Sequence, residues 1–203
     1  MKKLKYIAPI LIAVACLGLQ HAKANQVNYT LTNANDSGLG TGPYGTVNVN
    51  LTAPNMATIT FTAASGYLFV DGGSVAVNVN SNAWTIGTFN SNGDPVFDDG
   101  AGNEDGFGSF NQKVSMQNSS NGASIISFVL TNTSGTWLFG AANVLAFNGQ
   151  NWKVAAHIQI ATGLTGFAAG PNGGQQVPDG GTTVMLLGAA LGALGMARRY
   201  LFS

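Results

Sequence analysis

The densest group of side chains that could do chemistry lies in residues 94–108. Five of the seven acidic residues found between positions 25 and 176 fall in this stretch, interleaved with glycine. Ca²⁺ prefers about six to eight oxygen ligands in flexible geometry, so such a stretch predicts a calcium site on an acidic loop. The spacing matches neither an EF-hand nor a nonapeptide repeat, and a plain solvated loop stays the alternative. The candidate ligands are Asp94, Asp98, Asp99, Asn103 and Asp105.

Residues for acid–base or nucleophilic catalysis are few. His157 is the only histidine outside the terminal segments, and it lies in an apolar, strand-like run where a packed imidazole is a simpler interpretation than a general base. No serine stands in a nucleophile-elbow motif. Glycoside hydrolysis needs two carboxylates across a cleft, whereas Glu104 and the aspartates crowd one stretch. The sequence therefore predicts no catalytic residues and a protein that is not an enzyme.

Three tryptophans could instead bind a sugar, because a flat aromatic ring on a sheet can stack on the apolar face of a pyranose. Packing in the core is the competing interpretation, since aromatic side chains supply much of the buried area of a small domain. The candidate stacking residues are Trp84, Trp137 and Trp152.

The formal net charge of zero hides an uneven distribution. Residues 25–176 hold two lysines against seven acidic residues, a net charge of −5, while the other basic residues lie near the two termini. Binding to nucleic acid requires clustered basic groups, so this composition argues against a nucleic-acid partner.

Alternation of apolar and polar residues with a period of two predicts strands at 47–51, 57–62 and 75–80. Shorter apolar segments bounded by Gly, Asn, Asp or Pro predict further strands. These lie at 27–31, 66–70, 84–89, 110–116, 124–132, 144–147 and 152–160. About ten short strands joined by turns predict an all-β body over residues 25–169, an antiparallel β-sandwich of jelly-roll-like type.

The N-terminus has the three parts of a secretory signal peptide. A basic start at residues 1–5 is followed by an apolar run at 6–19 and by the small-residue site Ala22-Lys23-Ala24. Residues 1–24 are thus predicted to engage the secretory translocon and to be removed by signal peptidase. The only cysteine, Cys16, lies within this segment, so the mature protein would have neither a disulfide nor a thiol.

The C-terminus carries a second signal. A Gly/Asn/Gln linker at 170–176 leads to the turn-forming motif Val177-Pro178-Asp179-Gly180-Gly181. The uncharged residues that follow predict a short transmembrane helix at about 182–197. A helix over residues 180–197 would span about 27 Å, close to the thickness of the hydrocarbon core. Arg198 and Arg199 begin the basic tail 198–203 and would stop transfer at the cytoplasmic face. A buried helix or an ordinary tail anchor is the alternative.

This order of motif, apolar helix and arginine pair resembles the PEP-CTERM class of bacterial sorting signals, in a VPDGG-type variant. The resemblance implies export through the inner membrane and recognition of Val177–Gly181 by an exosortase, a membrane-embedded processing enzyme. It also implies a destination at the cell surface, the outer envelope or the extracellular matrix of a biofilm-forming bacterium.

Several functions fit such a body. The first is a structural, non-enzymatic envelope or matrix protein, whose partners would include extracellular polysaccharide. The second is a carbohydrate-binding β-sandwich, stabilised by calcium, and the third is a secreted hydrolase. Self-association through sheet edges is a fourth, because polar alternating strands specify their register weakly.

Overall fold

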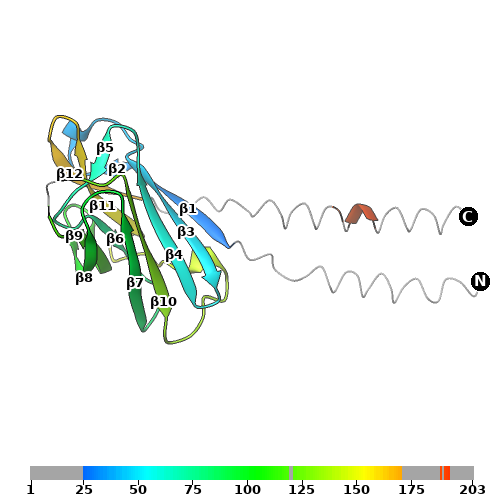
Figure 1. The fold of residues 1–203 in the computed structure, drawn as a ribbon. Helices are drawn as coiled ribbons and strands as arrows, with labels where there is room; N and C mark the ends of the chain where they lie inside the picture. Colours follow the sequence, from blue (N-terminus) through cyan, green and yellow to red (C-terminus); the bar gives the residue numbers. More distant parts are fainter. Residues whose placement is uncertain (1–24, 119–120, 171–187, 189, 193–203) are drawn as a thin grey trace, which may run out of the picture. The chain divides into compact units, whose positions relative to one another are not determined.

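The protein is described here by a computed structural model that covers residues 25–118, 121–170, 188 and 190–192. Two antiparallel sheets form the body (Figure 1). The first sheet has the order β1 (Gln26–Leu31), β3 (Gly45–Ala53), β4 (Met56–Ala63), β10 (Ile125–Asn132), β7 (Trp84–Ser91). The second has the order β2 (Asn33–Ala34), β12 (Thr165–Ala169), β11 (Val154–Ile160), β6 (Val75–Val77), β9 (Gly108–Met116), β8 (Val96–Glu104). β5 (Tyr67–Phe69) also pairs with β11.

The facing sides of the two sheets form one hydrophobic core. In β3, Val47 and Val49 are fully buried while Thr46 is exposed, as a period of two requires for a strand with one face inward. The second sheet contributes Val75 and Val77 from β6 to the same cluster. Burying a large apolar side chain contributes roughly 1.5–3 kcal/mol, so this shared interior is the main stabilising feature of the sandwich.

The outer face of the first sheet is polar. The strand registers place Asn28 of β1 opposite Asn48 of β3, and Asn48 opposite Thr60 of β4. The side-chain amide of Asn48 donates a hydrogen bond of 2.8 Å to Asn28 Oδ1. Such cross-strand pairs stabilise a sheet by roughly 0.2–1 kcal/mol each, so the Val-Asn alternation serves both faces of the sheet.

The second sheet differs, because it also carries apolar residues on its outer face. Ala76, Ala155 and Ala169 form a second, smaller cluster with Phe107 and Phe110. Phe107 comes from the tip of the β8–β9 hairpin, so this tip covers part of the face.

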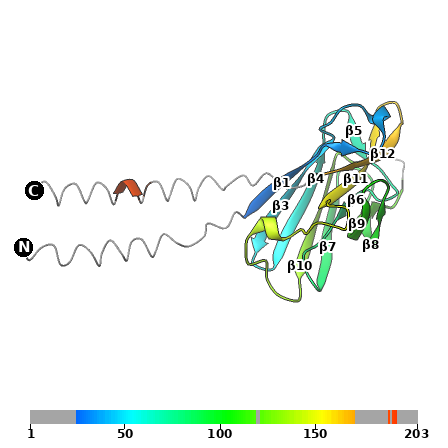
Figure 2. The same cartoon turned by 180° about the vertical axis from the view of Figure 1, so that it is seen from behind.

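Short 3₁₀ turns complete the body. Asp36 accepts a hydrogen bond from the backbone N–H of Gly38 and caps η2 (Ser37–Leu39). The other turn, η3 (Ala141–Asn143), lies beside β1 and β3, where it is drawn in yellow-green in Figure 2.

The all-β fold with antiparallel sheets is confirmed. The predicted strand at residues 144–147 is wrong: the chain leaves η3 there, and only Leu145 forms a bridge, with Val79. The strands β2, β8 and β12 were not predicted. Within the part of the chain that the structure describes, no helix is long and apolar enough to cross a membrane. Of the predicted helix at 182–197, residues 188 and 190–192 are described and are helical; the predicted signal peptide and sorting motif lie outside the described residues.

Candidate functional site: a lysine beside two carboxyl groups

The stretch that the sequence predicted to be an acidic loop is largely an edge strand. Residues Val96–Glu104 form β8, which pairs along its length with β9. A turn of Asp105, Gly106 and Phe107 joins the two strands, and the positive φ of Gly106 (79°) suits a residue without a β-carbon. The prediction of a loop was wrong because β8 exposes most of its residues and so lacks an apolar alternation.

Two bulges shape this hairpin. The register shifts between Asp98 and Gly100 and again between Gly100 and Gly102. Gly100 has φ of 65°, and Lys113 of β9 lies opposite it. Bulges bend a strand and re-aim its side chains, which here places acidic residues of β8 around Lys113.

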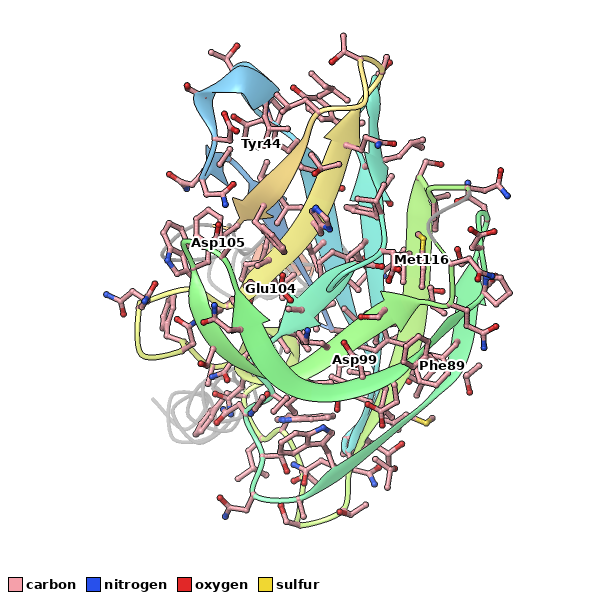
Figure 3. All side chains as sticks on the ribbon, turned by 90° about the vertical axis from the view of Figure 1, so that its left-hand side faces the viewer. Tyr44, Phe89, Asp99, Glu104, Asp105 and Met116 are labelled. Carbon is pink, nitrogen blue, oxygen red and sulfur yellow. The ribbon has the colours of Figure 1, made fainter. Side chains whose placement is uncertain are left out.

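Lys113 lies between Asp99 and Glu104. Its Nζ is 3.2 Å from Asp99 Oδ2 and 4.0 Å from Glu104 Oε1. The lysine side chain crosses Gly102, where a β-carbon would overlap Lys113 Cε. Figure 3 labels Asp99 and Glu104 along the hairpin, with Asp105 at its tip. We call Lys113, Asp99 and Glu104 the hairpin triad.

Glu104 is the unusual member of the triad. Its side chain is 0% exposed, and neither carboxyl oxygen has a hydrogen-bond partner among the residues that the structure describes. Burial raises the pKa of Glu104 to about 8, against the lowering effect of the Lys113 charge. The carboxyl group is therefore mostly protonated and neutral at pH 7, which avoids the high cost of burying a charge.

Asp99 has the opposite environment. The Ser115 hydroxyl donates a hydrogen bond of 2.7 Å to Asp99 Oδ2, and the side chain of Asp99 is 36% exposed. The Ser115 hydrogen bond, supported by Lys113, holds the pKa of Asp99 below its usual value despite partial burial. The two carboxyl groups beside Lys113 are thus an ionised one that faces solvent and a neutral one that is buried.

Glycine at position 73 makes room for the buried carboxyl group. A β-carbon at Gly73 would lie 2.6 Å from Glu104 Oε1, and Gly73 has φ of 96°. We predict that Gly73→Ala lowers the free energy of unfolding by about 1–3 kcal/mol, through backbone strain and displacement of Glu104. Chemical denaturation measures this, with Gly149→Ala as the control, because no atom of the described residues lies within 4 Å of a β-carbon there. Equal midpoints for the two variants would show that Gly73 does not pack against Glu104.

The five predicted calcium ligands do not gather around one point. Within the described residues, no group of three or more His, Cys, Asp or Glu side chains could hold a metal ion. Four of the five make separate contacts, and Asn103 lies opposite Ser109 in the strand register. The contacts are Asp94 with the backbone N–H of Asn121 (2.8 Å), Asp98 with Gln112 Nε2 (2.7 Å), Asp99 with Ser115 and Lys113, and Asp105 with Asn35 Nδ2 (3.1 Å).

The three tryptophans occupy different environments. Trp137 is 2% exposed and donates from Nε1 to the carbonyl oxygen of Asn80 at 2.9 Å, so its ring is buried in the core. Trp84 packs against the same core and donates to Gln112 Oε1 at 3.0 Å. Trp152 packs on the outer cluster, edge-on to Phe107. The rings therefore do not form one aromatic surface.

His157 lies in β11, as the sequence predicted. Its ring stacks on Phe167, with 4.5 Å between centroids, and Nδ1 contacts the backbone carbonyl of Asp71. Burial lowers the pKa of His157. The half-buried imidazole is thus packed against a neighbouring ring on the second sheet.

Comparison with known proteins identifies the C-terminal segment. Residues 176–201 match a family model described as the VPDSG-CTERM motif, which is a PEP-CTERM-like sorting tail. The match includes Val177–Gly181 and both Arg198 and Arg199, with Gly180 where the description has serine. No curated protein and no solved structure matches the chain. The fold and this match together define the class of protein: an all-β body followed by a sorting tail. The tail suggests export to the envelope or the surface.

Proposed function

We propose that this protein is an exported, non-enzymatic component of the bacterial envelope or extracellular matrix. An exosortase-type membrane enzyme would recognise Val177–Gly181 and release the body from the inner membrane. The observation that carries this proposal is the match of residues 176–201 to a sorting-tail model. In this proposal the tail directs export and processing, and the β-sandwich body is the part that reaches the envelope or the matrix.

Features of the body support a structural role. Within the part of the chain that the structure describes, all strands lie between Gln26 and Ala169 and form one two-sheet body. The outer face of the first sheet carries Asn and Thr side chains that pair across strands, as Asn28 and Asn48 do. A folded unit with such an uncharged polar face suits a hydrated matrix of polysaccharide.

The test compares the native protein from a host with its sorting enzyme and from the same host without it. We expect a form that begins at Asn25, ends near Val177–Gly181 and leaves the inner membrane only when the enzyme is present. Intact mass and membrane fractionation measure both properties.

Two variants sharpen this test. Pro178→Ala with Asp179→Ala changes the motif and should leave the full tail in the membrane, whereas Asp36→Asn, far from the motif in sequence, should be processed normally. A full tail retained in both hosts would make this a simple C-terminally anchored protein and refute the sorting role.

A further inference from the structure

A salt bridge between Lys113 and Asp99 does not explain why Glu104 is also buried next to Lys113. Asp99 alone gives Lys113 a carboxylate partner at 3.2 Å, and the Ser115 hydroxyl completes that contact. Glu104 adds a second carboxyl group that is fully buried and accepts no hydrogen bond from any described residue, and its Oε1 lies 4.0 Å from the same amine. An unpartnered buried carboxyl group costs stability, so its position next to the amine requires another explanation.

The hairpin triad and the Ser115 hydroxyl supply the groups that condensation of an amine with a carboxyl group requires. The nucleophilic nitrogen must be held against the carboxyl carbon, and a neutral acid must be close enough to transfer protons. A donor must also stabilise the oxygen on which negative charge develops. Lys113 Nζ lies against the Asp99 carboxyl group, Glu104 adjoins Lys113, and the Ser115 hydroxyl already binds Asp99 Oδ2.

We propose that Lys113 and Asp99 become joined by an intramolecular amide bond between Nζ and Cγ, with Glu104 as the group that transfers protons. The ammonium of Lys113 first gives a proton to the Asp99 carboxylate, which leaves a neutral amine and a neutral acid. Nζ then forms a bond to Cγ. Glu104 accepts a proton from the nitrogen and donates one to the departing oxygen, so the C–O bond breaks and water leaves.

The atoms and charges of this step balance. One carboxylate and one ammonium become one amide and one water, no group is oxidised or reduced, and Glu104 ends as it began. Asp99 is 36% exposed, so the water has a path to solvent. Amide formation is unfavourable between free molecules in water, but groups fixed in a fold reach effective concentrations of ~10⁵–10⁸ M. The fold thereby drives a single-turnover reaction without an external enzyme.

The neighbouring residues fit this role. Gly102 lets Lys113 reach across β8, and Gly73 leaves space for Glu104. Because burial keeps the pKa of Glu104 near 8, the acid form is present at neutral pH. With Cys16 as the only cysteine, a body lacking residues 1–24 has no disulfide, so this amide would be its covalent link between strands.

Intact-mass spectrometry of the folded full chain tests the bond. We expect a mass lower than the sequence mass by one water, and a branched peptide after digestion that joins residue 99 to residue 113. Lys113→Arg and Asp99→Ala should restore the full mass, whereas Lys153→Arg should keep the loss, because Lys153 instead donates to the carbonyl oxygen of Ala142.

Glu104→Gln keeps the shape of the side chain and should slow bond formation by at least tenfold, with folding checked by circular dichroism. Loss of water can also come from succinimide formation at Asp99-Gly100, so Lys113→Arg is the deciding variant. If the full-mass wild type persists after prolonged incubation, or if Lys113→Arg still loses water at this site, the proposal is overturned. Equal rates of bond formation for the wild type and Glu104→Gln would show that Glu104 does not transfer protons in this reaction.

Discussion

Phe61→Ala is expected to lower the free energy of unfolding by about 3–5 kcal/mol, the usual cost of removing a fully buried phenylalanine ring. Phe61 of β4 is 0% exposed and contacts rings from both sheets. It lies edge-on to Phe69 of β5, with 6.0 Å between centroids, and roughly parallel to Phe128 of β10 at 6.4 Å. Alanine would leave a cavity where the two sheets meet, and equilibrium urea unfolding measures the loss.

The matched control is Phe139→Ala, which removes a ring that is 75% exposed. We expect a change within about 0.5 kcal/mol for this variant, since substitutions on the surface away from specific contacts have small effects. If the two variants lost similar stability, the inter-sheet core would not be centred where the structure places it.

Most of the strand pattern could be predicted from sequence, for a physical reason. β3 and β4 each bury one face, so Val47 and Val49 alternate with Asn48, and the same holds for Ile59 and its neighbours. A buried face imposes the period of two that the sequence shows. The strand β8 was not predicted because this condition is absent there. β8 is an exposed edge strand rich in Asp and Gly, which are depleted in strands.

The hairpin triad could not be predicted in the same way. Five acidic residues lie near one another in the sequence, and four of them were predicted to be ligands of one calcium ion. The pairing of β8 with β9 instead places their side chains in different surroundings. The register and the two bulges decide that Lys113 meets Asp99 and Glu104. The Asp105-Gly106 pair before the predicted strand at 110–116 is a turn signal, but residues 96–104 lack the apolar alternation that completes a hairpin pattern.

The last prediction concerns the pH dependence of stability that Glu104 imposes. The pKa of its carboxyl group rises on folding from the ordinary 4.5 to about 8, chiefly because of burial. The folded protein therefore binds this proton more tightly than the unfolded chain does. The resulting stability is fully present below about pH 4.5 and falls as the pH rises toward 8, at up to about 1.4 kcal/mol per pH unit, with little further change above that.

Two variants isolate this effect from the proposed amide bond. Lys113→Arg keeps a positive charge beside Glu104 but cannot form the bond, so it serves as the reference for Lys113→Arg with Glu104→Gln. Because Gln does not titrate, the difference in unfolding free energy between the two should change by about 3–5 kcal/mol from pH 4.5 to 8, in favour of the Gln variant at the higher pH. His157, whose pKa burial lowers, titrates in both proteins and cancels in the difference. Denaturant unfolding across this range measures the change, and parallel stability profiles would show that Glu104 is not buried in the folded protein.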